Sequence, residues 1–170
     1  GGYTVEAGDL RVALLPGTDH LIQYEVDDWG RPIRETLIKV GEVAVAFPLL
    51  HGPFGEDGTV QGLFEMAKVR YVGCGVAASA VCQDKYLTKT VLAGAGIDVG
   101  EWTSFTKADW EGDSQRCAAQ VKALGYPVFV KPTRAGSSRG ITKVQDEGGL
   151  AAAVAEATSH DPRVIVEAAN

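Results

Sequence analysis

The stretch of this sequence best suited to chemistry combines lysine, glycine and serine between residues 124 and 144. Residues 128–130 are a short β-branched and aromatic run that leads into Lys131, and the segment 134–140 that follows reads Arg-Ala-Gly-Ser-Ser-Arg-Gly. Glycine lets backbone N–H groups approach an anion, serine adds donors, and lysine supplies a positive charge. The pattern favours a phosphate-binding loop between two strands; an ordinary hairpin with a turn-rich loop is the alternative.

Three further polar residues stand at the ends of expected elements. His51 follows an apolar strand at 43–47, Glu167 ends another at 163–166, and Lys85 opens a helix, where the helix dipole disfavours a cation by a few tenths of a kcal/mol. Each has an ordinary alternative: a structural histidine, a solvated carboxylate and a surface lysine. Their common position at strand or helix ends favours a functional role, because ligands of open α/β sheets bind at the carboxyl ends of strands.

Composition sets broad limits on the function. The 170 residues carry 22 acidic and 16 basic side chains, a net charge of −6, which argues against a general nucleic-acid binder. Three cysteines without C-x-x-C spacing suggest neither a zinc site nor a disulfide framework, so a reducing cytoplasm fits best. No apolar run reaches membrane-spanning length, and no signal peptide is visible, so no membrane partner is expected.

The apolar periodicity predicts a succession of short strands and helices. In the first part we expect a hairpin over 12–24, a turn at 30–32, a strand near 35–39, and a strand at 43–47 covered on both faces of a parallel sheet. A helix beginning near Thr59, capped by Asp57 or Thr59, leads to a strand at 71–72. After a small-residue connector at 73–79 come helices at 83–95, 113–124 and 148–158 and strands at 99–106, 128–130, 141–144 and 163–166.

Several of these segments resemble the D-alanine:D-alanine ligases, ATP-grasp enzymes of peptidoglycan precursor synthesis. The resemblance is carried by FPLLHGPFGEDGTVQG at 47–62, YVGCGVAAS at 71–79, FVKPTRAGSSRG at 129–140 and VIVE at 164–167. Asp84-Lys85 and Thr88-Lys89 also match. These motifs are long, stand in the family's order and cover about 43–167, whereas the first 40 residues match weakly.

The resemblance implies a role for each candidate residue. Lys85 and Lys131 would contact the phosphates of ATP, and the Gly/Ser loop at 136–140 would close over those phosphates. Glu167 would begin the segment that holds adenine and ribose. His51 lines the D-alanine site, Ser137 belongs to the substrate network, and Glu56 helps to order the same region. The predicted site is therefore catalytic Ser137 and Glu56, ATP-binding Lys85, Lys131, Gly136, Ser138, Gly140 and Glu167, and substrate-binding His51, with no metal ligand.

The implied reaction uses ATP and Mg²⁺ to form an acyl phosphate on one D-alanine, which the amine of a second D-alanine attacks. Lysines and magnesium would offset charge on the transferring phosphoryl group. The sequence departs from the family at Arg139, where valine or isoleucine is usual. The family's opening strand and everything after residue 170 are not in this sequence, so we expect the chain to lack the metal ligands and to be inactive alone.

The resulting fold prediction is α/β. Residues 1–73 are expected to be a partial N-terminal parallel-sheet (pre-ATP-grasp) domain, and residues 74–170 the central ATP-grasp α+β lobe, without the C-terminal lobe. In the full-length protein a homodimer in the cytoplasm is expected. A D-alanine:D-lactate ligase, a D-alanine:D-serine ligase and a non-catalytic fragment remain alternatives, because the residues that select the second substrate are not in the sequence.

Overall fold

The computed structural model describes residues 4–7, 10–27, 29–33 and 37–169, and the chain divides into two compact units. The first unit is Gly1–Ala80 and the second is Val81–Asn170; each is described by itself. Part of the predicted connector at 73–79 is helical, because α2 spans Val76–Gln83. Within the described ranges, every helix is too short or too polar to cross a membrane.

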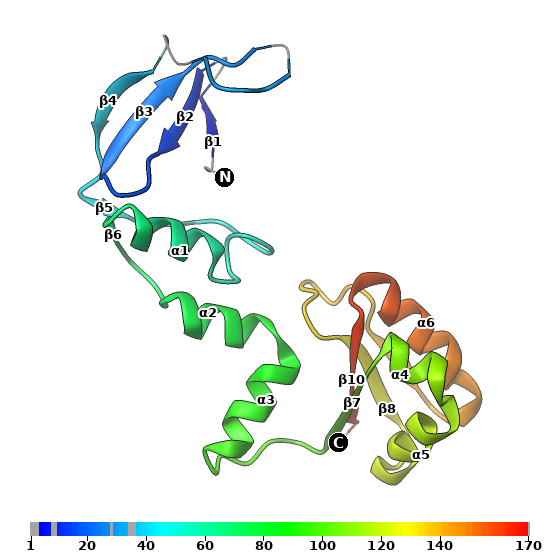
Figure 1. The fold of residues 1–170 in the computed structure, drawn as a ribbon. Coiled ribbons are helices and arrows are strands. Elements are labelled where there is room, and N and C mark those ends of the chain that lie inside the picture. Colours follow the sequence, from blue (N-terminus) through cyan, green and yellow to red (C-terminus); the bar gives the residue numbers. More distant parts are fainter. Residues whose placement is uncertain (1–3, 8–9, 28, 34–36, 170) are drawn as a thin grey trace. The chain divides into compact units, whose positions relative to one another are not determined.

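A four-stranded antiparallel sheet begins the first unit (Figure 1). Its strands follow the chain in order: β1 (Thr4–Ala7), β2 (Leu10–Leu14), β3 (His20–Tyr24) and β4 (Ile38–Glu42). The β2–β3 pair confirms the hairpin, and a bridge between Val26 and Pro32 confirms the turn. The strand expected at 35–39 lies at 38–42, and residues 35 and 36 of that prediction lie outside the described residues.

A parallel strand pair and one helix complete the part of the first unit that carries His51. Strands β5 (Val45–Ala46) and β6 (Arg70–Tyr71) pair in parallel, and α1 (Thr59–Met66) connects them. The apolar side of α1 is buried, as predicted. Gly58, rather than Asp57 or Thr59, is the N-cap residue of α1. The prediction that β5 is covered on both faces is wrong, since Val45 is 51% exposed.

The second unit is built on a four-stranded antiparallel sheet. Its strands are β7 (Trp102–Thr106), β8 (Val128–Pro132), β9 (Thr142–Val144) and β10 (Arg163–Ala168), in the order β7-β10-β8-β9. Three helices, α4 (Lys107–Gly112), α5 (Ser114–Leu124) and α6 (Leu150–His160), lie on one side of this sheet (Figure 1). Helix α6 follows a short 3₁₀ turn, Glu147–Gly149. The sequence predicted all of these elements except α4.

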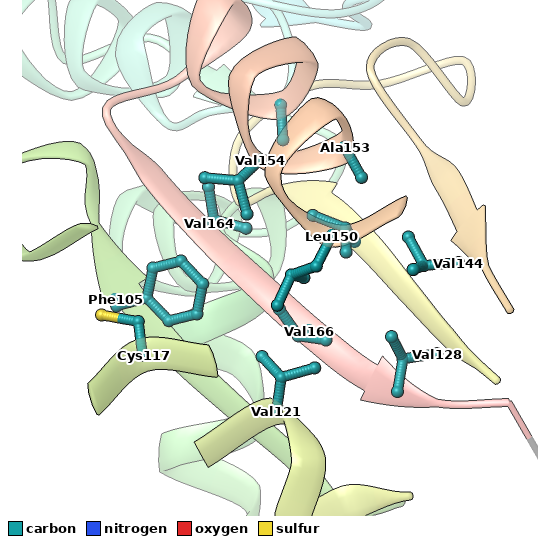
Figure 2. Packing of buried hydrophobic residues seen from close by; sticks show 12 residues of the cluster. Phe105, Cys117, Val121, Val128, Val144, Leu150, Ala153, Val154, Val164 and Val166 are labelled. Atoms are coloured by element: carbon teal, nitrogen blue, oxygen red, sulfur yellow. The ribbon is translucent and has the colours of Figure 1, made fainter. Parts of the chain in front are cut away.

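One face of this sheet carries the core of the second unit. Alternate residues of β8 and β10 point toward α5 and α6, where they meet the buried sides of both helices (Figure 2). The core consists of Phe105, Cys117, Val121, Val128, Val130, Val144, Leu150, Ala153, Val154, Ala157, Val164 and Val166. Because strand side chains alternate between faces, the residues between these positions must lie on the opposite face of the sheet.

Helix α3 (Lys85–Gly94) lies within the predicted range 83–95. Its apolar side is not covered by the described residues: Leu87 is 40% exposed, Val91 is 52% exposed, and no residue of this helix is buried. The helix is anchored through polar contacts of its lysines, described below.

Candidate functional site

The candidate site lies on the face of the second sheet opposite its core. Val128 and Val130 are buried in the core, so Phe129 and Lys131 face the other way. The β8–β10 register pairs Phe129 with Glu167, which places Glu167 diagonally across from Lys131. Both charged residues lie one position before the carboxyl ends of their strands, in agreement with the sequence prediction. They meet because the strands are antiparallel.

Glu167 lies between two lysines. Its Oε2 accepts a hydrogen bond from Lys131, and its Oε1 lies 3.1 Å from the Nζ of Lys89 on α3. The side chain of Glu167 is only 17% exposed. Burial alone would raise the pKa of Glu167, but the hydrogen bonds from both lysines outweigh it and hold that pKa below its usual value. Glu167 is therefore a carboxylate with two cationic partners.

Lys85 is tied to the start of the loop. Its Nζ donates to the carbonyl oxygen of Ala135 at 2.8 Å and to that of Thr133 at 3.4 Å, and its backbone N–H donates to Thr133 at 3.0 Å. Burial, followed by the positive charge of Lys131, lowers the pKa of Lys85. We call Lys85, Lys89 and Lys131 the lysine cluster: Lys89 and Lys131 contact Glu167, and Lys85 lies within electrostatic range of it. With Arg134, these cations face the carboxylates of Glu167, Asp84 and Asp161, and the remaining excess of positive charge favours a polyanionic ligand.

The loop at 134–140 presents its polar groups outward. Ser137 and Ser138 both have left-handed backbone conformations, with φ of 49° and 57°, and the N–H of Arg139 donates to the carbonyl of Gly136 at 3.1 Å. In the portion of the chain that the structure covers, neither serine hydroxyl has a hydrogen-bond partner, and both residues are exposed. The loop therefore supplies free donors beside the lysine cluster, and this donor set fits the phosphate groups of a nucleotide.

Asp161 anchors the base of this loop, a role that the sequence reading missed. The residue is only 4% exposed, and its Oδ2 accepts from the Nε of Arg134 at 2.7 Å and from the hydroxyl of Thr133 at 3.3 Å. It also accepts from the backbone N–H groups of Arg134 and Arg163. Burial opposes ionisation, but these hydrogen bonds hold the pKa of Asp161 below its usual value. From the sequence alone, Asp161 and Pro162 predict only the end of the preceding helix.

Gly140 closes the loop at a position that only glycine suits. Its φ is 67°, and a Cβ there would lie 2.5 Å from Cδ2 of His160.

We expect Gly140→Ala to lower the free energy of unfolding of the second unit by about 2 kcal/mol, measured by urea denaturation. Gly136→Ala is the matched control: a Cβ there meets nothing within 4 Å, so stability should change by less than about 0.5 kcal/mol. Equal stability of the two variants would contradict the close packing of Gly140.

His51 and Glu56 lie in the first unit, in the loop between β5 and α1. The Oε2 of Glu56 accepts from the backbone N–H of Gly52 at 2.6 Å, which ties the two ends of this turn together. Asp57 likewise accepts from the N–H groups of Phe54 and Thr59. The side chain of His51 is exposed, and no hydrogen bond to it is found among the described residues. The loop is thus ordered by its carboxylates, and His51 is presented to solvent.

The described residues of the second unit do not bring together a set of metal ligands. Among the described residues, three potential ligands converge only at Asp19, His20 and Glu42 in the first unit, with ligand atoms within 4.8 Å of one another. That group is partly exposed, and Glu42 is ion-paired with Lys39 at 2.5 Å. Glu167 is paired with two lysines. The lysine cluster therefore suits phosphate, and among the described residues no group of three potential metal ligands lies beside it.

Comparison with known proteins identifies relatives over both units. The family model described as the D-ala D-ala ligase N-terminus matches residues 23–74, and the one described as the D-ala D-ala ligase C-terminus matches residues 91–170. A curated D-alanine–D-alanine ligase of Kineococcus radiotolerans is 61% identical over 82% of this chain and 37% of its own length. One from Bifidobacterium adolescentis is 49% identical over 98% of this chain and 48% of its own length.

Solved structures that resemble this chain are also ligases of this kind. The VanG D-Ala:D-Ser ligase from Enterococcus faecalis matches 99% of this chain and 50% of its own, with a TM-score of 0.76 and 33% identity. The D-alanine–D-alanine ligase from Coxiella burnetii matches 86% of this chain and 50% of its own, with a TM-score of 0.71 and 30% identity. The predicted fold class is confirmed by these neighbours. The chain spans about half the length of the proteins it matches most fully.

Proposed function

Because this chain belongs to the D-alanine–D-alanine ligase family, we propose that the protein containing it joins two D-alanines at the expense of ATP, for peptidoglycan precursor synthesis in the cytoplasm. The observation that carries the proposal is the lysine cluster beside the loop at 134–140. Its excess positive charge and the free serine hydroxyls are what a site for the phosphates of ATP requires. ATP supplies the phosphoryl group that activates the carboxylate of one D-alanine.

Within the proposed site, each residue of the second unit has a physical task. Lys85 and Lys131 hold phosphate oxygens and offset the charge that develops on the transferring group. Gly136 and Gly140 keep the loop backbone close to the phosphates, and Ser138 donates its hydroxyl to them. Ser137 links the loop to the amino-acid substrates. Glu167, at the end of the cluster, accepts hydrogen bonds from the adenosine part of the nucleotide.

The loop of the first unit is proposed to bind the first D-alanine. Glu56 orders the turn through its bond to the backbone of Gly52, and His51 contacts the substrate. We expect His51→Ala to raise KM for D-alanine by about 2- to 10-fold, the loss of one hydrogen bond, and to change KM for ATP less. Steady-state kinetics with each substrate varied in turn measure both constants. A larger change in KM for ATP would move His51 to the nucleotide site.

Mg²⁺ belongs to the proposal only as a partner of ATP. It would accompany the phosphate groups of ATP, and among the described residues of the second unit no group of three potential metal ligands converges. We also propose that the full-length protein is a homodimer, which a measurement of its molar mass in solution would test.

The proposal is tested by measuring ADP release. The protein that contains this chain should release ADP in the presence of ATP, Mg²⁺ and D-alanine, and should form D-alanyl-D-alanine in equal amount. D-lactate and D-serine as second substrates test the alternative ligase activities, one of which the Enterococcus faecalis neighbour's name states for that protein. The 170-residue chain alone is expected to release no ADP that depends on D-alanine. Absence of D-alanine-dependent ADP release from the whole protein would refute the proposed function.

A further inference from the structure

Lys89 is the member of the lysine cluster that the proposed function leaves without a task. We infer that Lys89 is a positioning residue: it remains the counter-ion of Glu167 when a nucleotide binds, and thereby frees Lys131 to hold the phosphates. This inference rests on the proposed function, because it takes ATP phosphates as the second partner of Lys131.

The geometry separates the contacts of the two lysines on Glu167. Lys131 binds Oε2, whereas Lys89 lies 3.1 Å from Oε1, so one lysine can leave without displacing the other. The Nζ of Lys89 also donates to the carbonyl oxygen of Gly100 at 3.1 Å. Lys89 stands four residues after Lys85 on α3, so both side chains project from the same side of that helix. Two acceptors and a helical backbone hold Lys89 in place.

The need for a second counter-ion follows from burial. Glu167 is 17% exposed, and a carboxylate shielded from water is costly when it loses its only cationic partner. With Lys131 as its sole partner, Glu167 would compete with phosphate for that lysine. Lys85 is not placed for this task, because its ammonium group points to the carbonyls of Thr133 and Ala135 and forms no ion pair with Glu167 among the described residues. Lys89 is the residue placed to keep Glu167 paired while Lys131 changes partners.

A purely structural role for Lys89 would have a different consequence. If Lys89 only tied α3 to the backbone at Gly100, its loss would alter the whole nucleotide site and weaken ATP and adenosine alike. If it acts through Lys131, its loss should weaken only ligands that carry phosphates. Adenosine lacks phosphates, so it separates the two roles.

The test compares ATP with adenosine in the protein that contains this chain. For Lys89→Gln, calorimetry should give a Kd for ATP raised about 3- to 30-fold, within the range for coupled residues in one charge network, with Kd for adenosine changed less than about twofold. Lys89→Arg should retain ATP affinity, since it keeps the charge. Lys107→Gln is the control: Lys107 lies on α4 and is exposed, with Glu111 as its ion-pair partner at 3.9 Å.

A second comparison removes the carboxylate. In the Glu167→Gln background there is no negative charge for Lys89 to neutralise, so adding Lys89→Gln should cause no further loss of ATP affinity. Unchanged ATP affinity in the single variant, equal loss for ATP and adenosine, or additive losses in the double variant would each overturn the inference. If Lys89→Gln alone does not fold, the Glu167→Gln pair carries the test. Failure of the unaltered protein to bind ATP would instead refute the proposed function.

Discussion

Replacing Lys131 by alanine in the protein that contains this chain is expected to weaken transition-state stabilisation with ATP by about 1.5–3 kcal/mol, the range for a hydrogen bond to a charged group. That corresponds to a roughly 10- to 150-fold lower kcat/KM for ATP. The reason is that Lys131 is a mostly buried ammonium group on the sheet face beside the loop, within an excess of positive charge. Steady-state kinetics with ATP varied at saturating D-alanine measure the effect.

Lys143→Ala is the matched control for this experiment. The Nζ of Lys143 lies 5.6 Å from the centre of the Phe129 ring, nearly the same distance as that of Lys131, at 5.4 Å. Lys143 has no carboxylate partner among the described residues. A cation above the same ring but outside the lysine cluster should matter less, by under about threefold in kcat/KM. Unchanged KM and kcat in Lys131→Ala would remove Lys131 from the nucleotide site.

Replacing Asp161 by alanine is expected to lower the free energy of unfolding of the second unit by about 2–3 kcal/mol. The change leaves the buried hydroxyl of Thr133 and two backbone N–H groups without their acceptor. The expected loss in the free energy of unfolding is smaller than the full cost of breaking a buried ion pair, because the side chain of Arg134 is 57% exposed. Urea unfolding followed by tryptophan fluorescence measures the loss, in a Trp29→Phe background that leaves Trp102 and Trp110 as reporters.

The pH dependence of this loss has a definite sign. The pKa of Asp161 is lowered in the folded state, so its contribution is fully present above the pKa of the unfolded carboxyl, about 4, and is lost as pH falls through the folded value. The stability difference between the wild type and Asp161→Asn should therefore shrink below about pH 4. Glu111→Gln, an exposed pair with Lys107, should change stability by less than about 1 kcal/mol at any pH. A pH-independent difference for Asp161→Asn would contradict an ionised Asp161 in the folded state.

Local patterns in the sequence predicted most elements of the second unit, because its helices and strands carry regular apolar periodicity. The sequence also singled out the loop at 134–140 and Lys85 and Lys131 as candidates, since glycine, serine and strand-end lysine leave a local signal; the structure brings Lys85 to the start of that loop. The pairing of Lys131 with Glu167 was not predictable, because it depends on the antiparallel register of two strands 36 residues apart. Lys89 had a weak signal in its four-residue spacing from Lys85.

The errors have physical causes as well. The apolar run at 43–47 predicted a strand covered on both faces, yet an apolar pattern, there as in the helix at 83–95, reports which side chains are apolar and not what covers them. Next to Pro162, Asp161 predicts only a helix end, which is a local signal. Its role at the base of the loop comes from hydrogen bonds to residues 27 and 28 positions away. The exposed Val45, Leu87 and Val91 and the buried Asp161 are thus cases in which tertiary contacts decide what local pattern cannot.

The most direct test of the central claim is protection of lysines by ATP. The protein that contains this chain is treated briefly with an amine-acetylating reagent, with and without saturating ATP and Mg²⁺, and each lysine is quantified by mass spectrometry. If the lysine cluster holds the phosphates, ATP will slow acetylation of Lys85 and Lys131 and leave Lys107 and Lys122, on helices of the opposite side, unchanged. Equal acetylation of Lys85 and Lys131 with and without saturating ATP would contradict the account.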